Sequence, residues 1–186
     1  MSFDLDKKNI LGKIDKSKKG EIDEGIQEIV DIINSKENYY TTSSCSGRIV
    51  LIEIPESGRK DESKWLLATH NKTSLNEVKS SLRSEKDVWL KAEGMILHVC
   101  CKTIKDAENL VNLAKNTGFK RTGMITVNKR YIVEIVSTEN VSTIVMKKGK
   151  LLVDDSYLSA LIDECNAKMD KNNAKLKEFH KKLITF

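Results

Sequence analysis

The chain has 186 residues, of which 39% are hydrophobic and 32% charged, with 32 Lys and Arg against 27 Asp and Glu. This composition is typical of a globular protein that can build a core, and the net charge of +5 is compatible with an anionic partner, although Lys-rich surfaces are common. No apolar run approaches the ~20 residues that a membrane-spanning helix needs, and the start MSFDLDKK lacks the apolar core of a signal peptide, so we expect a cytoplasmic protein.

Two helices are predicted at the start of the chain. Apolar residues recur at helical spacing over residues 3–14, and a polar loop follows at residues 15–25. After Asp23, which suits an N-cap, residues 26–33 carry the apolar stripe of the second helix. Residues 34–37 end it.

The pattern then changes from helical to extended. Residues 49–54 (IVLIEI) and 65–70 (WLLATH) are predicted strands. Ser74 and Glu77 form a capping box that opens a short helix. Two further strands, at residues 88–94 and 95–101, follow with little room between them.

A similar succession occupies the next part of the chain. Thr103 and Asp106 cap an amphipathic helix that Gly118 closes. Three strands are expected at residues 118–127, 130–136 and 142–149, and apolar residues from 158 to 176 predict a long helix whose other face is rich in Lys.

The order of these elements indicates the fold class. We predict an α+β fold with a mixed, partly barrel-like sheet built from two loosely similar strand–helix–strand halves and flanked by N- and C-terminal helices. A doubly wound parallel sheet is not expected. With one proline and no low-complexity linker, residues 1–186 should form one domain, with N-terminal helices to about 37, a sheet-containing core over about 38–154 and a C-terminal helix over about 155–184.

Residues 39–48 (YYTTSSCSGR) are the strongest candidate for a functional centre. The hydroxyl groups of Ser43, Ser44 and Ser46, the backbone of Gly47 and the guanidinium of Arg48 offer groups that can hold a ligand, and Arg48 suits a phosphate or carboxylate. The segment is predicted to be a binding loop between a helix end and a strand start. The alternative is a polar connection whose hydroxyls bond to their own backbone.

The cysteines give little support for metal or thiol chemistry. Cys45, Cys100, Cys101 and Cys165 form no CxxC pair and lack the spacing of zinc or iron–sulfur ligands, so we expect reduced thiols and no metal. A thiolate at Cys45 would sit beside Arg48, but no local pattern provides a partner histidine, so Cys45 is expected to pack as a small apolar residue.

Other candidates lie at or near predicted strands. His70, at the end of a strand, is a candidate general base or a group that orients a substrate. Lys91 and Glu93 share a face with Trp89, either as a salt bridge or as the wall of a pocket. His98 lies among apolar neighbours, where a hydrogen-bonded core histidine is favoured.

Basic residues also gather near predicted strand ends. Lys120, Arg121, Lys129 and Arg130 are candidates for a phosphate-binding rim, and an edge strand protected by positive charge would produce the same pattern. Glu134, between apolar residues, needs a partner if it is buried.

Several familiar motifs are missing from the sequence. It has no GxxxxGK[ST], GxGxxG, HExxH or GxSxG. In particular, no glycine-rich strand–turn–helix supports an ordinary Rossmann-type cofactor site.

The sequence DKSKKGEIDEGIQEIVDIINSKENYYTTSSCSGRI resembles the N-terminal signature of the tRNA wybutosine-synthesising protein 3 family. The segments KWLLATH, LKAEGMILHV, AENLVNLAKNTGFKRTGMI and RYIVEIVST follow in the family's order. LLVDDSYLSALIDECNAK resembles the C-terminal part of archaeal members, so the resemblance covers nearly the whole chain.

This resemblance implies a tRNA methyltransferase that uses S-adenosylmethionine and is not Rossmann-like. Its substrate would be the tricyclic, guanosine-derived base just 3′ of the anticodon of phenylalanine tRNA, methylated on a ring nitrogen. We expect His70 or Glu93 to act as the base, and Lys91, Lys120, Arg121 and Arg130 to contact RNA. The cofactor-binding residues would be Ser43, Ser44, Ser46, Gly47, Arg48 and Trp65.

Two other functions are compatible with the sequence. One is a non-catalytic RNA-binding or adaptor module, which the net positive charge of the chain supports. The other is an enzyme that binds a small anion at the serine-rich segment without RNA.

Overall fold

The computed structural model describes residues 2–12, 22–57 and 59–186 of the chain. The helices are α1 (Phe3–Leu11), α2 (Glu24–Ser35), α3 (Leu75–Ser81), α4 (Ile104–Asn116) and α5 (Asp155–Ile184), with a short 3-10 helix at Lys60–Glu62. The strands are β1 (Tyr39–Cys45), β2 (Arg48–Ile54), β3 (Lys64–Thr69), β4 (Asp87–Glu93), β5 (Ile96–Cys101), β6 (Gly123–Thr126), β7 (Tyr131–Val136), β8 (Val141–Lys147) and β9 (Lys150–Leu151).

Helices α1, α3 and α4 begin at residues whose side chains cap them. Both predicted capping boxes are present, Ser74 with Glu77 at α3 and Thr103 with Asp106 at α4. Helix α1 begins after Ser2, whose side chain accepts from the Leu5 amide. Ile14 of the first predicted helix and residues 15–21 of the predicted loop lie outside the described residues.

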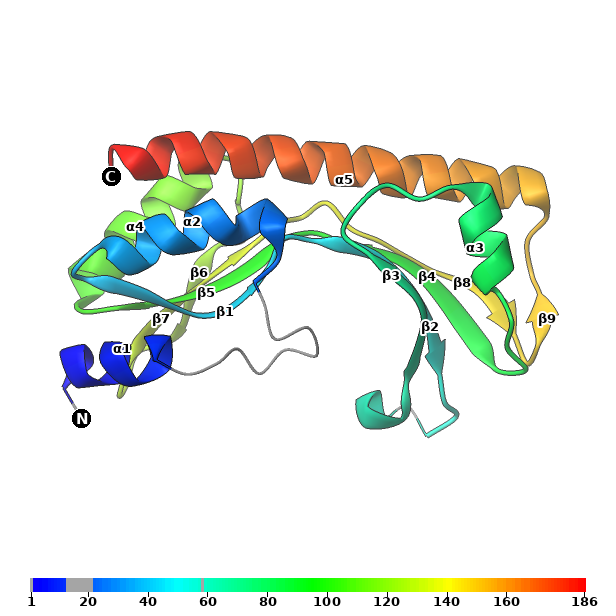
Figure 1. The fold of residues 1–186 in the computed structure, drawn as a ribbon, viewed down its shortest axis with the longest axis horizontal. Coiled ribbons are helices and arrows are strands. Elements are labelled where there is room, and N and C mark those ends of the chain that lie inside the picture. The colour runs from blue at the N-terminus through cyan, green and yellow to red at the C-terminus, as the bar shows by residue number, and fades with distance from the viewer. Residues whose placement is uncertain (1, 13–21, 58) are drawn as a thin grey trace. The chain divides into compact units, whose positions relative to one another are not determined.

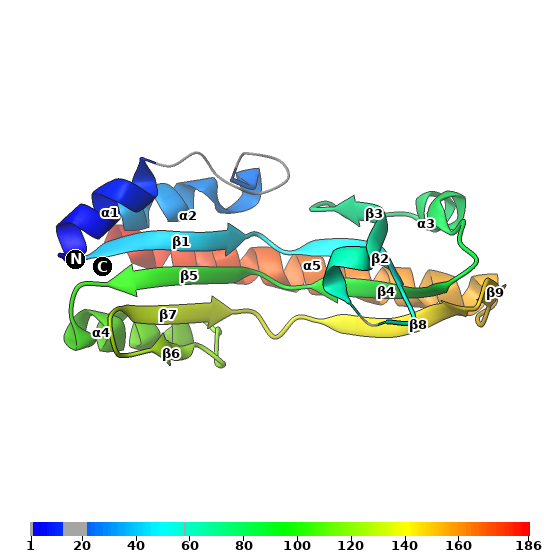
Figure 2. The ribbon, with the colours of Figure 1, turned by 90° about the horizontal axis from the view of Figure 1, so that it is seen from below.

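The chain divides into two compact units. The first consists of residues 1–46, 95–138 and 173–186, and the second of residues 47–94 and 139–172. The first unit contains a four-stranded antiparallel sheet in the order β1-β5-β7-β6 (Figures 1 and 2). Its core lies between one face of this sheet and the helices α2 and α4 with the last turns of α5.

The second unit contains a five-stranded antiparallel sheet in the order β3-β2-β4-β8-β9. Leu158, Ile162, Cys165 and Met169 from the first half of α5 pack with Val78 of α3 over one face of this sheet. Ile49, Leu51, Val88, Leu90 and Ala92 are the residues of β2 and β4 on that face. The side chains of β2 and β4 that alternate with them therefore project from the opposite face.

The α+β class and the flanking helices are confirmed, but the arrangement of the sheet differs from the prediction. The described strands form two antiparallel sheets that do not close into a barrel, instead of one mixed, partly barrel-like sheet. The change of sheet between β1 and β2 occurs at Ser46-Gly47, where Gly47 has φ +102°. A residue in this conformation cannot continue an extended ladder, so pairing stops there. The prediction of a single domain stays a prediction.

Local strand boundaries also differ. The expected strand at 118–127 is confined to Gly123–Thr126, because Gly118 has φ +98° and the Phe119 amide donates to Ala114 O. Strand β9 was not predicted. It pairs with β8 across a tight turn in which Lys148 and Gly149 both have positive φ. None of the described helices combines the length and apolar character that crossing a bilayer requires.

Candidate functional site

The segment at residues 39–45 is a strand and not the binding loop that the sequence predicts. It pairs with β5 along its length. Tyr39 packs in the core, and the amide of Thr41 donates to Asn34 of α2. A bulge between Thr41 and Ser43 places Ser43 opposite His98, on the other face. Ser44 is opposite the buried Leu97, so these two hydroxyls point to opposite faces of the sheet.

Ser46 has a partner within its own unit. Its amide nitrogen lies 3.0 Å and its Oγ 3.4 Å from Oδ2 of Asp23. Asp23 occupies the N-cap position of α2, as predicted, but its side chain bonds to Ser46 and not to the helix. Ser46 is buried, so its hydroxyl serves the packing of this turn. The sequence gives no local signal for a pair separated by 23 residues.

The second unit brings together three of the predicted site residues. Arg48 and Glu93 are directly opposite each other in the pairing of β2 with β4. Arg48 Nε donates to Glu93 Oε2 at 2.8 Å, and the guanidinium lies 4.3 Å from the centre of the Trp65 ring. These groups form what we call the Arg48 cluster: Arg48, Trp65 and Glu93.

Trp65 reaches this cluster because of a β-bulge. The pairing of β2 with β3 shifts between Leu51 and Ile52, so that Leu66 is the extra residue on β3. Leu66 and Leu67 consequently both pack against the core, and Trp65 is turned to the face that carries Arg48. Trp65 is 45% exposed. The bulge is therefore what makes this tryptophan available to a ligand.

The same face of the sheet carries the other aromatic and basic candidates of β4. Trp89 lies opposite Ile52 and Lys91 opposite Val50, with Glu93 next in the row. Trp89 and Lys91 are half-buried. Residues of β8 continue the row, since Ser142 is opposite Lys91. The predicted shared face of Trp89, Lys91 and Glu93 is present in the structure, and Glu93 forms its salt bridge with Arg48.

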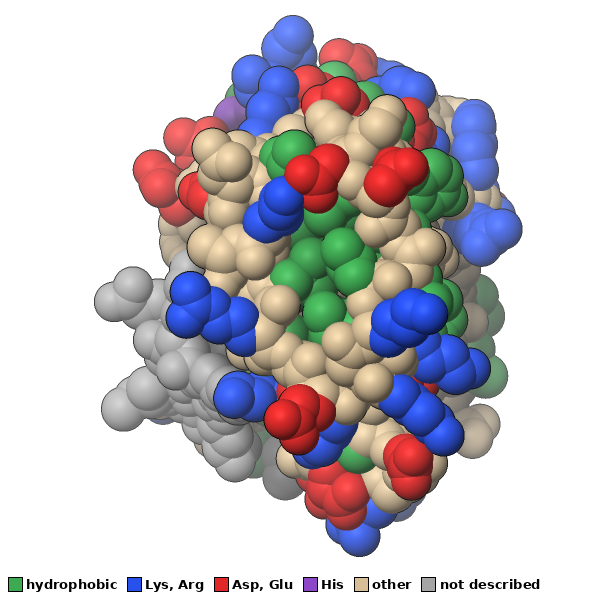
Figure 3. Space-filling view, turned by 90° about the vertical axis from the view of Figure 1, so that its right-hand side faces the viewer, with side chains coloured by type: hydrophobic (Ala, Val, Ile, Leu, Met, Phe, Trp, Pro, Cys, Tyr) green, Lys and Arg blue, Asp and Glu red, His purple; other side chains and the backbone are tan. Residues whose placement is uncertain are grey.

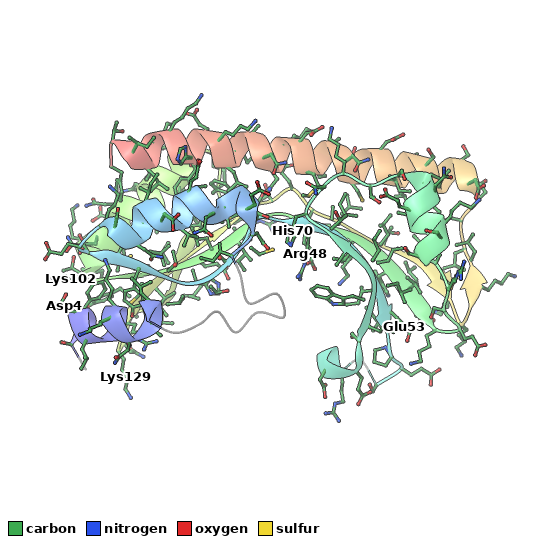
Figure 4. The ribbon with its side chains drawn as sticks, viewed as in Figure 1. Asp4, Arg48, Glu53, His70, Lys102 and Lys129 are labelled. Atoms are coloured by element: carbon green, nitrogen blue, oxygen red, sulfur yellow. The ribbon has the colours of Figure 1, made fainter. Side chains whose placement is uncertain are left out.

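His70 follows β3 and lies at the same end of the paired strands as Arg48 (Figure 4). Its Nδ1 is 2.7 Å from the backbone oxygen of Gly47. Because a carbonyl oxygen only accepts hydrogen bonds, Nδ1 carries the hydrogen, and in a neutral ring the lone pair is then on Nε2. This tautomer is the one in which Nε2 can accept a proton.

The residues of the predicted basic rim differ in whether an ion pair already holds them. Lys120 and Arg121 are exposed in the turn before β6, and Lys129 is exposed in the β6–β7 hairpin. Arg130 is held by Asp6 of α1, with Nη2 2.7 Å from Oδ1 and Nε 2.7 Å from Oδ2. The sequence does not indicate this partner, which lies 124 residues away.

His98 is hydrogen-bonded, as predicted, but it is half-buried and does not lie in the core. Its Nε2 is 3.0 Å from Oε1 of Glu134, its neighbour across the pairing of β5 with β7. The same bond gives the half-buried Glu134 a partner.

None of the four cysteines, all of which lie within the described residues, forms a disulfide. Burial raises the pKa of Cys165 to about 11 and that of Cys101 to about 12, and it also raises the pKa of Cys100. These thiols therefore stay protonated near neutral pH. Cys45 is half-buried.

A pocket in the second unit lies away from the Arg48 cluster. It is lined by charged residues around Ile54 and Asp87, at the opposite end of the β2–β4 pairing from Arg48 and Glu93. None of the predicted site residues lines it. Figure 3 shows a different feature, an apolar area bordered by acidic and basic side chains on the side of the molecule at the right of Figure 1.

Comparisons with known proteins agree on one family. A sequence model of the family described as "Methyltransferase TYW3" matches residues 5–185. A Pyrococcus horikoshii protein named tRNA(Phe) 7-((3-amino-3-carboxypropyl)-4-demethylwyosine(37)-N(4))-methyltransferase 1 is 39% identical over 186 residues, which cover 98% of this chain and 95% of that protein. A mouse protein named tRNA wybutosine-synthesizing protein 3 homolog is 37% identical, over 93% of this chain and 69% of its own length.

Solved structures give the same answer for the fold. A protein from Pyrococcus horikoshii has a TM-score of 0.90 and 39% identity, with 98% of this chain and 96% of that chain covered. A hypothetical protein from Aeropyrum pernix has a TM-score of 0.75 and 31% identity, with 87% and 96% covered.

Proposed function

The chain belongs to the Methyltransferase TYW3 family, and we propose that it transfers a methyl group from S-adenosylmethionine to a ring nitrogen of 7-(3-amino-3-carboxypropyl)-4-demethylwyosine in phenylalanine tRNA. The observation that carries the proposal is the similarity over nearly the whole chain to relatives named for this reaction. The base lies just 3′ of the anticodon, and a cytoplasmic location is part of the same proposal.

The methyl donor would be held on the face of the second sheet that carries the Arg48 cluster. Trp65 offers a ring for stacking and Arg48 a cation for a carboxylate, a donor set that suits a nucleoside with an amino-acid end. When bound, S-adenosylmethionine supplies an electrophilic methyl group on a sulfonium, and its transfer depends on positioning. The backbone of Gly47 lies beside His70 in this region. The Arg48 cluster does not include Ser43, Ser44 or Ser46. That these three residues bind the cofactor stays a prediction from the sequence.

His70 is the general base in this proposal. A ring nitrogen that bears a proton must lose it before or during attack, and an acceptor is needed for that proton. The Nδ1 bond to Gly47 holds the imidazole in the tautomer whose Nε2 accepts. Glu93 is the alternative base, although its Oε2 already accepts from Arg48.

Contacts to tRNA are proposed for the basic residues. Lys91 projects from the same sheet face as the Arg48 cluster, and Lys120 and Arg121 are exposed. Arg130 belongs to the same prediction, but its ion pair with Asp6 supports a structural role as well.

The test is mass spectrometry of tRNA treated with the enzyme and S-adenosylmethionine. We expect the wild-type chain to add one methyl group, confined to the hypermodified base. His70→Ala should lower kcat by about 100- to 10,000-fold if His70 moves the proton. Saturable tRNA binding without any methyl transfer by the wild-type chain would favour the non-catalytic adaptor instead.

His180→Ala is the matched control. His180 is a half-buried histidine of α5, 3.4 Å from Glu28, and the proposal gives it no part in the reaction. Its removal should leave kcat within about twofold of wild type. Normal turnover in His70→Ala would remove His70 as the base.

A further inference from the structure

The ion pair between Arg48 and Glu93 leaves much of its hydrogen-bonding capacity unused. A guanidinium has five N–H donors, and the bond to Glu93 Oε2 uses only the one on Nε. Within the described part of the chain, the Arg48 side chain has polar or ring contacts with Glu93 and Trp65. The four N–H groups on the two Nη atoms and the second oxygen of Glu93 are therefore open to a ligand.

The pair also contributes little to stability. The side chains of Arg48 and Glu93 are 28% and 41% exposed. Partly exposed ion pairs of this kind stabilise a fold only slightly, because water screens the attraction. Small rearrangements of the pair on ligand binding therefore cost little free energy.

The arrangement is rigid enough to recognise a shape. Arg48 and Glu93 are cross-strand neighbours on adjacent strands of one sheet, which sets their separation. The Trp65 ring lies against the guanidinium and restricts the directions in which the Nη groups can point. A cationic fork and a carboxylate oxygen are thus held next to each other on an accessible surface.

We propose that Arg48 and Glu93 together bind the α-amino-α-carboxylate end of a 3-amino-3-carboxypropyl group. The ligand carboxylate would accept two hydrogen bonds from the Nη groups of Arg48, and the ligand ammonium would donate to Glu93. In an amino acid these two charged groups are attached to the same carbon, so they suit two adjacent protein charges of opposite sign. The Arg48–Glu93 bond need not break for this to happen.

This inference rests on the proposed function, which supplies two sources of the group. S-adenosylmethionine carries a 3-amino-3-carboxypropyl chain on its sulfonium. The base named for the relatives carries the same chain on its tricyclic ring. The chemistry of recognition is common to both, so the experiment has one arm for each source.

The variants are Arg48→Lys, which keeps the charge but loses the fork, and Glu93→Gln, which keeps the shape but loses the charge. Arg59→Lys and Glu164→Gln are the matched controls, because these residues of the same unit are exposed and belong to surface ion pairs. Thermal melts followed by circular dichroism check that each variant is folded.

The first arm measures binding of S-adenosylmethionine and of 5′-methylthioadenosine, which lacks the amino-acid end, by titration calorimetry. If the pair holds the methyl donor, both variants should weaken binding of S-adenosylmethionine by about 10- to 100-fold. Their affinity for 5′-methylthioadenosine should stay within about twofold of wild type.

The second arm compares methylation of tRNA that bears the 3-amino-3-carboxypropyl chain with tRNA whose 4-demethylwyosine lacks it. If the pair holds the substrate, the wild-type preference in kcat/KM for the chain-bearing tRNA should fall by about 10- to 100-fold in both variants. A fall in kcat of Glu93→Gln alone, equal for both tRNAs and without any loss of binding, would make Glu93 the base and overturn the inference.

The outcomes separate the inference from the proposed function. The inference is overturned if the wild type is active and both variants match it in two respects. These are the affinity for S-adenosylmethionine and the preference in kcat/KM between the two tRNAs. A wild-type chain that methylates neither tRNA would refute the proposed function, and the calorimetric arm would then decide the inference by itself.

Discussion

Asp6 illustrates how one residue can join a helix to a sheet. Its Oδ2 accepts from the hydroxyl of the fully buried Tyr40 at 2.6 Å, and Arg130 donates to both of its oxygens. The hydrogen bond from Tyr40 and the adjacent guanidinium lower the pKa of Asp6, against the opposing effect of burial. Phe3 adds a ring contact with Tyr40, at 5.2 Å between centroids. This cluster attaches α1 to the outer face of the first sheet.

We therefore expect Asp6→Asn to lower the free energy of unfolding by about 1–3 kcal/mol at pH 7, because an amide keeps only one of the two acceptor oxygens and loses the charge that attracts Arg130. The lowered pKa of Asp6 fixes the sign of the pH dependence. Its contribution is complete above about pH 4, the ordinary value for Asp, and is lost as the pH falls through the lower folded value. Urea denaturation of wild type and of Asp6→Asn from pH 7 to 3 measures the difference between their free energies of unfolding. This difference should become smaller toward pH 3.

Asp4→Asn is the control on the same helix. Asp4 is 72% exposed and lies 3.5 Å from Lys102, toward which it points in Figure 4. Its loss should change stability by less than about 0.5 kcal/mol. A difference between wild type and Asp6→Asn that stays constant down to pH 3 would contradict the assignment.

At the scale of elements, the end of α4 depends on one glycine. Gly118 has φ +98°, and the Phe119 amide donates to Ala114 O at 3.0 Å. This turn places Phe119, fully buried, against Phe179 of α5 at 5.6 Å between ring centroids. Helix termination and core packing in the first unit are therefore coupled.

Gly118→Ala should lower the free energy of unfolding by about 1–2 kcal/mol, because a residue with a Cβ is strained at this φ. Steric overlap is not the cause, since the added Cβ would lie 3.5 Å from the nearest atom, in Lys175. Urea denaturation followed by circular dichroism measures the change.

Gly123→Ala provides a comparison of opposite sign. Gly123 has no atom within 4 Å of an added Cβ and its φ is not positive. This variant should be unchanged or more stable, by up to about 1 kcal/mol, because alanine restricts the unfolded chain. Equal destabilisation by both substitutions would refute the backbone explanation for Gly118.

At the scale of the whole molecule, the net charge of +5 favours association with tRNA. Phosphate contacts by Lys and Arg release counterions, so binding weakens as salt rises. Lys120 and Arg121 are exposed in the turn before β6, whereas Arg130 is neutralised by Asp6. The first two are therefore the better residues for testing the proposed RNA contacts.

Lys120→Glu and Arg121→Glu should each weaken tRNA binding and reduce the slope of log K against log salt by about one unit. Binding measured by filter retention at several salt concentrations gives the slope. Lys150→Glu, at an exposed position on β9 of the second unit, makes the same change of charge at a residue that is not part of the predicted rim. If all three variants show the same slope as wild type, the RNA contacts lie on other residues.

The sequence by itself determined the features that depend on neighbours along the chain. The capping boxes of α3 and α4 and the glycine that ends α4 were predictable, because a helix end is decided by three or four consecutive residues. The family was also predictable, since its motifs are contiguous runs such as SSCSGRI. The α+β class followed from the order of helical and extended periodicities.

Only the tertiary structure decided which distant groups meet. Strand pairing into two sheets, the bulge that turns Trp65 toward Arg48, and the carboxylates that hold Ser46 and Arg130 join residues far apart in the chain. Such contacts depend on competition among many pairings of similar local preference, so no short pattern encodes them. Arg48 and Glu93 form a pair only because β2 and β4 are neighbours whose register places the two residues opposite each other.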